Sequence, residues 1–421
     1  MKSKRTAEEA AVDIIRQLWR SGHTALLAGG CVRDGLLGLH PKDFDVATDA
    51  TPDQVAETFP RTRRVGAQFG VVLVRRWGHD CEVATFRTDG TYSDGRRPDT
   101  VSFGQAEDDA KRRDFTINAL FRDPIDDSVI DYVGGAADLK AGIIRTVGDP
   151  SLRFGEDHLR MLRAVRFAAR LGFAVAEETW TAIGQLAARL RIISPERIWM
   201  ELESMLTAHS RSEAWRLLVE SGLERYLTDR EDWLFEPSTA PLERLALPAS
   251  ERLRRLPKKA AGAALVMSTL LADSDQKAIN QTSRALRWSN KLHDDVSWLV
   301  RYLHFALKDE APELADLKLM RVHHCWEDLG RLMRVHVAAC GSGDSRCESV
   351  LHRATLIPEA SLDPAPLLDG HSLISIGISH GPITGRIIKS VRRAQLNEEI
   401  NSTDDALRLA RELAAGSDGS D

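Results

Sequence analysis

The spacing of hydrophobic and polar positions changes about a third of the way along the chain. The first part holds short apolar runs at 25–28, 71–74 and 81–86, separated by segments that contain glycine, and this predicts strands within a mixed α/β region. From about Arg153 onward the chain consists of long segments rich in Leu, Ala, Arg and Glu, a pattern typical of helices. We therefore expect an α+β fold, with a mixed N-terminal head and an all-helical remainder.

Length and composition indicate a folded chain of several domains. The 421 residues exceed one ordinary core and 43% are hydrophobic, which excludes disorder as the main state. The formal charge is −5, so any RNA binding must come from local basic patches.

Five cysteines without a Cys-x-x-Cys pair favour reduced thiols and a cytoplasmic location. No signal peptide or membrane span is evident, so we expect a soluble chain without a membrane partner.

A glycine turn directly follows the first apolar run. The sequence AGGCVRDGLLG predicts a strand that ends at Gly29 and Gly30 and leads into a helix. Glycine lets backbone amides approach an anion closely, and the N-terminus of the helix adds partial positive charge. Arg33 lies in the first turn of that helix and is placed to add a full positive charge. The turn is therefore a candidate phosphate site.

Two aspartates follow the glycine turn in the sequence HPKDFDVAT. On a strand, Asp43 and Asp45 share one face while Phe44 and Val46 enter the core. Two close carboxylates repel each other unless a cation lies between them, and hard oxygen ligands near a phosphate favour Mg²⁺. Such a pair suits phosphoryl or nucleotidyl transfer. The alternative is a strand edge with solvated aspartates, but the glycine turn upstream favours the metal site.

The blocks AGGCVRD and KDFDVAT resemble the nucleotidyltransferase superfamily of DNA polymerase β. The resemblance is closer to its branch of tRNA nucleotidyltransferases and bacterial poly(A) polymerases, and segments 81–104, 109–120 and 130–150 are similar to further blocks of that branch. It implies a polymerase β-like catalytic head at 1–149, a helical neck at 150–210, a body at 211–357 and a tail at 358–421. It also implies that Asp43 and Asp45 are catalytic and hold Mg²⁺, and that Gly29, Gly30, Arg33 and Arg113 bind the nucleotide.

A second group of polar residues lies in 154–170, FGEDHLRMLRAVRFAAR, which we predict as one helix. Asp157, Arg160, Arg163 and Arg166 follow at intervals of three, so they form a polar face. A carboxylate beside a guanidinium can bind the Watson–Crick edge of cytosine or adenine. The alternative is a solvated face on which Asp157 and Arg160 pair with each other. By resemblance, Asp157 and Arg160 read the base, while Arg163 and Arg166 lie near the nucleotide and its phosphates.

The resemblance implies a Mg²⁺-dependent enzyme that adds C, C and A to the 3′ end of tRNA from CTP and ATP. The alternatives are an enzyme that adds only A, a poly(A) polymerase, and a non-catalytic RNA-binding relative. The last is disfavoured because both the acidic pair and the base-reading pair are present. The sequence carries no pattern that indicates an oligomeric state.

Several smaller features have more than one interpretation. Residues 86–103 predict a mobile loop over the site or a surface hairpin, and FTINAL predicts a helix that Asp114 caps. Arg112 is as readily a structural partner of an aspartate as a phosphate ligand, and Glu82 is a weak candidate for a third acid. The segment SPERIWMEL, by resemblance, braces the base-reading helix.

The helical remainder carries basic clusters and several histidines. The basic residues fit either RNA contact or solvated helix faces. They are Arg252, Arg254, Arg255, Lys258, Lys259, Arg386, Lys389, Arg392 and Arg393. His293 and Asp294, and His323 and His324 with Asp328, lack the order of a metal phosphohydrolase. We expect charged helix faces there instead of a metal.

Overall fold

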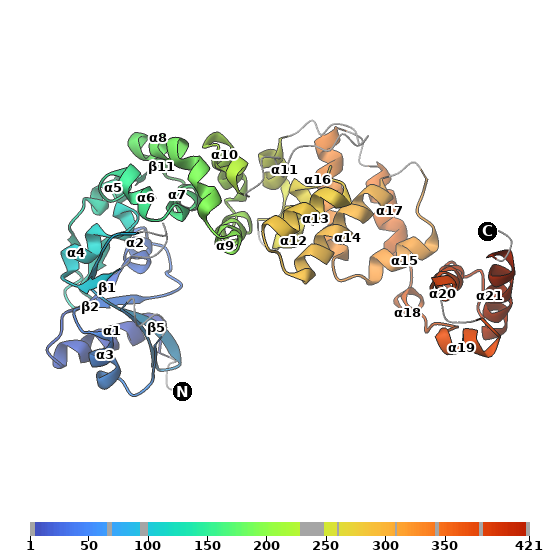
Figure 1. Cartoon of the computed structure of the whole chain (residues 1–421), viewed down its shortest axis with the longest axis horizontal. Helices are drawn as coiled ribbons and strands as arrows, with labels where there is room; N and C mark the ends of the chain where they lie inside the picture. The colour runs from blue at the N-terminus through green and yellow to red at the C-terminus, as the bar shows by residue number, and fades with distance from the viewer. Residues whose placement is uncertain are drawn as a thin grey trace. The chain divides into compact units, whose positions relative to one another are not determined.

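The computed structural model describes residues 5–64, 70–92, 100–227, 248–258, 261–307, 310–341, 345–378 and 382–417. The chain divides into two compact units. One is Met1–Trp233 with Ala285–Arg287, and the other is Leu234–Arg284 with Trp288–Asp421. The predicted α+β fold is confirmed, because a mixed sheet occupies the N-terminal part and helices make up nearly all of the rest (Figure 1).

A seven-stranded mixed sheet forms the head, in the order β3-β4-β5-β2-β1-β8-β9. β2 and β5 are parallel, whereas the other neighbouring pairs are antiparallel. The strands are β1 (Ala25–Ala28), β2 (Asp45–Thr48), β3 (Thr62–Arg64), β4 (Val71–Arg76), β5 (His79–Thr85), β8 (Leu120–Arg122) and β9 (Val129–Asp131). The three predicted apolar runs are therefore the strands β1, β4 and β5.

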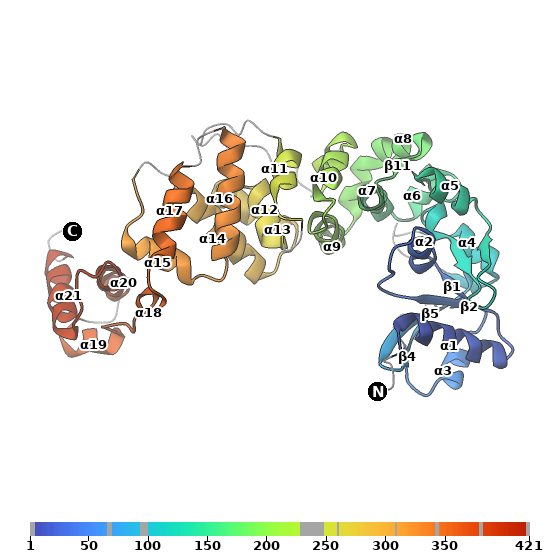
Figure 2. The ribbon, with the colours of Figure 1, turned by 180° about the vertical axis from the view of Figure 1, so that it is seen from behind.

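Helices cover the two faces of this sheet. α1 (Ala7–Arg20) packs on β1, β2 and β5, and α3 (Pro52–Thr58) packs on β4 and β5. Both begin with a capping box, at Thr6 and at Thr51. α2 (Gly30–Leu36) contacts β1 and β8 and lies away from α1 and α3 (Figures 1 and 2). α4 (Ala106–Lys111) and α5 (Gly135–Ala141) complete the head helices.

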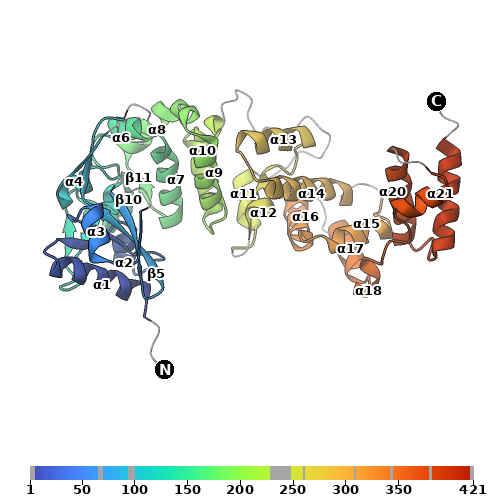
Figure 3. The same ribbon diagram turned by 60° about the horizontal axis from the view of Figure 1, so that its bottom comes forward.

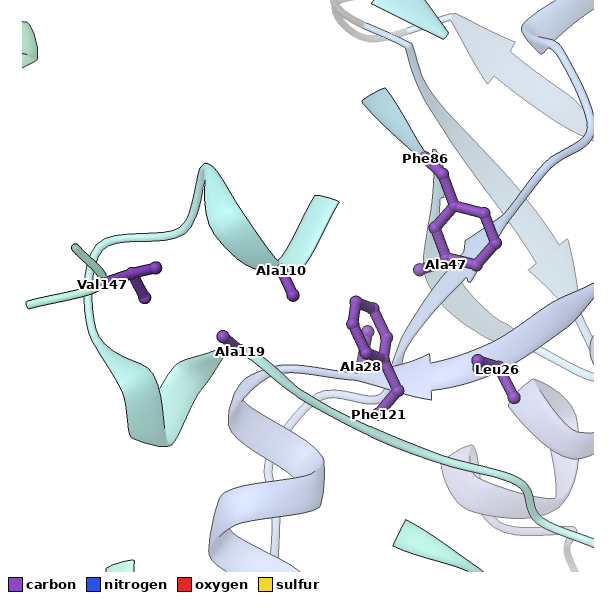
Figure 4. Packing of buried hydrophobic residues seen from close by; sticks show 8 residues of the cluster. All are labelled: Leu26, Ala28, Ala47, Phe86, Ala110, Ala119, Phe121 and Val147. Atoms are coloured by element: carbon purple, nitrogen blue, oxygen red, sulfur yellow. The ribbon is translucent and has the colours of Figure 1, made fainter. Parts of the chain in front are cut away.

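A hydrophobic cluster fixes the face of the sheet that carries the acidic pair (Figure 4). Phe86 and Phe121 meet edge to face with ring centroids 5.9 Å apart, above the small side chains of Ala28 and Ala47. In the register of β1 and β2, Ala28 is opposite Asp45 and Leu26 is opposite Ala47. Because side chains alternate along a strand, Asp45 lies on the same face as the cluster, at the strand end where this packing stops.

Two predictions for the head need correction. FTINAL does not form the expected α-helix; a short 3₁₀ turn, η2 (Thr116–Asn118), leads directly into β8. Asp114 therefore caps no α-helix, and its Oδ1 accepts hydrogen bonds from the Phe115 amide and the Asn118 side chain. Within 86–103, β6 (Arg87–Asp89) and β7 (Val101–Phe103) form an antiparallel pair, which agrees with the hairpin interpretation. Residues 93–99 of this segment lie outside the described residues.

The neck contains short helices and one small strand pair. Its helices are α6 (Pro150–Glu156), α7 (Leu159–Leu171), α8 (Glu177–Leu186), η3 (Ala187–Ile192) and α9 (Pro195–Leu206), and α10 (Arg211–Glu220) and η4 (Leu223–Tyr226) follow them within the first unit. β10 (Ile143–Ile144) and β11 (Ala174–Val175) pair in parallel, so this region is not entirely helical. The prediction of one helix over 154–170 is also wrong, because Asp157 has extended backbone angles of φ −151° and ψ 105° and separates α6 from α7.

Every regular element in the described residues of the second unit is a helix. α14 (Asn290–Ala306) and α16 (Trp326–Cys340) pack on each other and on α12 (Ala263–Leu270). The remaining helices are α11 (Ala249–Arg255), α13 (Gln276–Ala285), α15 (Leu314–Val322), α17 (Ser345–Thr355), α18 (Glu359–Leu362), α19 (Gly370–Ser375), α20 (Pro382–Leu396) and α21 (Thr403–Ser417). α19, α20 and α21 enclose a hydrophobic cluster of their own, and α20 and α21 lie side by side (Figure 3). No described helix is long and apolar enough to cross a membrane.

Polar side chains join α20 to α15. Lys318 is only 1% exposed, and its Nζ lies 2.8 Å from Oε1 of Glu398. Arg393 pairs with Asp316 at 2.8 Å, and Oδ1 of Asn397 accepts the amide of Ala315. A buried ammonium requires a partner, because desolvation of a charge is costly. These contacts therefore attach the C-terminal helices to the helices before them.

We expect Glu398→Gln to lower the free energy of unfolding by about 1–2 kcal/mol, because it leaves the buried ammonium of Lys318 without its carboxylate. Lys318→Met in the same background should restore most of this loss, since it removes the buried charge itself. Chemical denaturation of the two single variants and the double variant would measure the coupling. Glu412→Gln, at an exposed position of α21, is the matched control. Additive effects of the two substitutions would contradict the proposed ion pair.

Candidate active site

A polar cavity of about 750 Å³ lies between the head sheet and the neck helices of the first unit. Except for Glu82, the candidate third acid, every residue named from the sequence as a catalytic or nucleotide-binding candidate lines it. The lining residues are Gly29, Gly30, Arg33, Asp43, Asp45, Arg112, Arg113, Asp114, Asn118, Asp157, Leu159, Arg160, Arg163, Arg166, Phe167, Arg170 and Arg197. Residues far apart in the sequence are thus brought to one place.

The glycine turn forms one wall of the cavity. Gly29 has φ +72°, in the left-handed region, and α2 begins at Gly30 as predicted. A Cβ at position 29 would lie 2.7 Å from Nη1 of Arg113. That guanidinium cannot retreat easily, because Nη1 donates to the carbonyl of Asn118 and Nε to Asp109. The turn therefore requires glycine both for its backbone conformation and for the close approach of Arg113.

We expect Gly29→Ala to raise the KM for the nucleotide by about tenfold, because the new methyl group displaces Arg113 from the cavity and the positive φ costs about 1 kcal/mol. Gly38→Ala is a matched control: Gly38 has φ +68°, but no atom lies within 4 Å of a Cβ there. Steady-state kinetics on both variants compare a positive-φ glycine that faces Arg113 with one that faces open space. Equal effects at the two positions would contradict the role assigned to Arg113.

The two acids lie at the start of β2. Asp45 is the first residue of the strand, and Asp43 is exposed just before it, so only part of the predicted strand alternation is present. Val46 is fully buried as expected, whereas Phe44 is only half-buried. Burial, together with the negative charges of Glu82 and Asp43, raises the pKa of Asp45 to about 6, against the opposing effect of Arg113. Glu82 is exposed and does not line the cavity.

Head residues that the sequence analysis missed hold the arginines in position. Asp109 is 1% exposed and pairs with both Arg112 and Arg113. Burial alone would raise the pKa of Asp109, but the two guanidinium groups outweigh it and lower the pKa. Arg33 is 3% exposed, binds Asp34 at 2.8 Å and donates to Asn118. The position of Asp109, three residues before Arg112 and four before Arg113, is the sequence pattern that could have indicated this pairing.

The neck supplies the predicted base-reading pair. Asp157 and Arg160 do not pair with each other: Oδ2 of Asp157 accepts from Arg197 at 2.7 Å, and Oδ1 accepts the Leu159 amide at 3.1 Å. Arg160 pairs with Glu156 and donates to the Arg153 carbonyl at 2.7 Å. Each side chain is therefore held from behind by other groups, and the interpretation as a self-paired solvated face is wrong.

The helix α9 braces this wall, as the resemblance implied for SPERIWMEL. Besides Arg197, it supplies Glu201, which lies 2.7 Å from Arg166 and 3.8 Å from Arg163. Arg163 also pairs with Asp114 at 2.6 Å. Burial would raise the pKa of Asp114, but Arg163 and the Asn118 hydrogen bond hold it at about 2. The sequence analysis recognised the brace but named neither Arg197 nor Glu201.

The cavity therefore carries negative and positive groups on different parts of its lining. Carboxylates gather at the start of β2, and guanidinium groups line the facing wall. Such a surface suits a polyanion whose charge is shared between cations at the acids and the arginines. Asp157 adds an oriented acceptor next to the donor Arg160, which suits the edge of a base.

The basic clusters of the second unit are largely engaged within the protein. Arg252 donates to the Thr269 carbonyl, and Arg254 pairs with Glu251. Arg392 and Arg393 pair with Asp363 and Asp316. Arg386 and Lys389 are exposed on α20. Lys259, and Gly381 before α20, lie outside the described residues.

Comparisons with known proteins agree with this arrangement. Residues 25–145 match the Poly A polymerase head domain, and residues 172–229 match the family described as a probable RNA and SrmB-binding site of polymerase A. The chain is 47% identical over 230 residues to the CCA-adding enzyme of Geobacillus thermodenitrificans, covering 54% of this chain and 57% of that enzyme. It is 34% identical over 384 residues to the CCA-adding enzyme of Levilactobacillus brevis, covering 90% of this chain and 91% of that enzyme.

Two further relatives extend the comparison. Poly(A) polymerase I of Escherichia coli is 42% identical over 262 residues, with 58% of this chain and 55% of that protein covered. The crystal structure of the Bacillus stearothermophilus CCA-adding enzyme in complex with CTP superposes with a TM-score of 0.75 at 30% identity, covering 99% of this chain and 100% of that one. The fold and site thus define a nucleotidyltransferase head with a helical remainder. The chain belongs to the family of CCA-adding enzymes and bacterial poly(A) polymerases.

Proposed function

We propose that this protein adds C, C and A to the 3′ end of tRNA, using CTP and ATP and releasing pyrophosphate. One observation carries the proposal: a single cavity holds an acidic pair, a glycine turn and an oriented Asp157 beside Arg160. The acids and the turn serve nucleotidyl transfer in general, whereas the Asp157 and Arg160 pair selects cytosine and adenine. The full-length similarity to CCA-adding enzymes supports the same substrates.

Asp43 and Asp45 fit a divalent cation. The pKa of Asp45 is raised by burial and by neighbouring carboxylates, so this group of acids is held together at an electrostatic cost that a cation would remove. The donors are carboxylate oxygens, the ligands that Mg²⁺ prefers. We propose that these two residues hold Mg²⁺. Bound there, Mg²⁺ would make the attacking hydroxyl more acidic and stabilise the charge on the leaving pyrophosphate.

The chain's own residues would then orient the reactants. The tRNA 3′ hydroxyl attacks the α-phosphorus of the nucleotide, and the bond to pyrophosphate breaks. Gly30, the first residue of α2, lines the cavity, so the N-terminus of this helix offers partial positive charge to a phosphate, while the Gly29 amide donates to the Leu120 carbonyl. Arg113, fixed by Asp109, supplies positive charge next to the turn. Arg163 and Arg166 supply it from the neck wall.

Base selection follows from donors and acceptors. The Asp157 carboxylate accepts a hydrogen bond from the exocyclic amine of cytosine or adenine, and Arg160 donates to the adjacent ring nitrogen or carbonyl. Uracil and guanine present a carbonyl where the amine would be, which leaves the carboxylate facing an oxygen. The same pair therefore accepts both C and A without a nucleic-acid template.

The proposed activity can be tested on the whole chain with Mg²⁺. Purified protein would be given CTP, ATP or both, with tRNA that ends before the first C, tRNA that ends in CC, and an unstructured RNA. CCA addition predicts C, C and A on the first tRNA and one A on the second. Only A on tRNA ending in CC would indicate an A-adding enzyme, long A tails on unstructured RNA a poly(A) polymerase, and no incorporation a binding protein.

We further propose that the helical remainder binds tRNA and that the protein acts in the cytoplasm. The match of residues 172–229 to an RNA-binding family supports the first part. The exposed Arg386 and Lys389 of α20 are candidate phosphate contacts. None of the five cysteines, all of which lie in the described residues, forms a disulfide, which is consistent with a reducing compartment.

A further inference from the structure

A cluster of metal-ligating side chains lies in the second unit, at the turn between α15 and α16. His323 is the C-cap residue of α15, and Cys325 is the N-cap residue of α16. The turn is closed by the Trp326 amide, which donates to the His323 carbonyl at 2.9 Å. This turn places one potential ligand atom each of His323, His324 and Cys325 within 4.8 Å of one another. Three consecutive side chains thus converge instead of pointing apart.

The histidine rings are fixed by neighbouring groups. The ring of His323 stacks on Trp298 with centroids 3.9 Å apart, and the rings of His323 and His324 lie 4.4 Å apart. Nε2 of His324 lies 2.8 Å from Oδ1 of Asp295 on α14. Histidines that bind metals usually form such a hydrogen bond to a carboxylate through one ring nitrogen, which leaves the other nitrogen for the metal.

The exposure of the side chains around the cluster suits a shielded sulfur ligand and the entry of a cation from solvent. Cys325 is 5% exposed, so its sulfur is shielded from bulk solvent. The His324 side chain is 59% exposed and gives a cation a way in. Nζ of Lys291 lies 2.7 Å from Asp295 and 3.2 Å from His324, so a positive charge already stands beside the cluster. Because the Lys291 side chain is 72% exposed, it can turn into solvent when another cation binds.

We propose that His323, His324 and Cys325, with Asp295 orienting His324, form a site for a thiophilic divalent cation such as Zn²⁺. Imidazole nitrogen and thiolate sulfur are the donors that Zn²⁺ and Co²⁺ bind in preference to Mg²⁺. On binding, the thiol of Cys325 loses its proton to solvent and the metal–sulfur bond forms. The cation would join α14 to the turn between α15 and α16, so its role is structural and separate from the carboxylate site of the head.

From the sequence, these histidines were expected on charged helix faces because the order of a metal phosphohydrolase was missing, and Cys325 was expected to be a reduced thiol. The structure pairs Asp328 with Arg331 and Asp294 with His293, and it is Asp295 that contacts His324.

Cobalt titration of the full chain tests this site. Protein stripped with EDTA and dialysed would be titrated with Co²⁺, and the near-ultraviolet thiolate-to-cobalt absorption would be followed. We expect the band to saturate at one equivalent and Zn²⁺ to remove it, whereas excess Mg²⁺ leaves it unchanged. The carboxylates Asp43 and Asp45 contain no sulfur and cannot produce this band.

Variants assign the band to these residues. Cys325→Ser should abolish it, and His324→Gln, at an exposed position that is safe for folding, should weaken Co²⁺ binding at least tenfold. Asp295→Asn should weaken it about tenfold through the lost orientation of His324. Cys340→Ser is the matched control, because the Cys340 sulfur lies 3.5 Å from a single histidine, His336. Absence of the band in the unmodified protein, or its persistence in folded Cys325→Ser, would overturn the proposal.

Discussion

Asp45→Asn should reduce incorporation of both CMP and AMP by about 10³-fold or more, because it removes the more buried carboxylate of the acidic pair. Asp43→Asn should have a comparable effect. The amide keeps the shape of the side chain but carries no charge, so the loss would reflect cation binding and not packing. Steady-state incorporation on tRNA with CTP or ATP, at several Mg²⁺ concentrations, would measure it.

Two controls sharpen this prediction. Asp53→Asn removes an exposed carboxylate of the head that pairs with Arg64, and it should leave incorporation unchanged. Glu82→Gln tests whether Glu82 acts as a third acid. Because Glu82 does not line the cavity, we expect incorporation to fall by less than about tenfold, through the lost electrostatic effect of Glu82 on Asp45. Affinity for tRNA should persist in Asp45→Asn. Near-normal incorporation by a folded Asp45→Asn protein would remove the metal assignment.

The parts of the site that local sequence determines were predicted well. The glycine turn and the acids follow from one strand, one turn and the alternation of side chains, all of which act over a few residues. Gly29 has the predicted position, and Asp45 lies at the start of its strand. The cavity unites these residues with the neck, as the resemblance to a known family had implied.

The errors have a common physical origin in contacts between distant segments. Nothing in EDHLRM breaks a helix by propensity, yet the backbone is extended at Asp157, whose carboxylate binds Arg197 forty positions later. FTINAL holds Phe, Thr and Ile, which favour strands over helices, and its last residue, Leu120, begins β8, which pairs with β1. Arg33 was expected to add positive charge for an anion, and in the structure its guanidinium donates hydrogen bonds to Asp34 and Asn118. Tertiary partners of this kind leave no periodic signal in one sequence.

The same long-range contact between Asp157 and Arg197 gives the second large prediction. Asp157→Asn exchanges one acceptor oxygen for an amide donor at the base edge. We therefore expect the preference for CTP over UTP, and for ATP over GTP, to fall by about 10- to 100-fold, since the amide can donate to the carbonyl of uracil or guanine. Ratios of kcat/KM for single-nucleotide addition would measure this, and affinity for tRNA should change little.

Arg197→Met should reduce the same selectivity by a smaller factor, because Arg197 acts on the base only by holding Asp157 in place. A positioning role for Arg197 predicts two results. Arg197→Met alone discriminates less well between CTP and UTP, and Arg197→Met added to Asp157→Asn causes no further loss of discrimination. A residue that merely stabilised the neck would instead lower the melting temperature and leave the ratio unchanged. Arg216→Met, on an exposed face of α10 where Arg216 pairs with Glu213 and Glu220, is the matched control. Unaltered discrimination in folded Asp157→Asn would contradict base reading by the carboxylate.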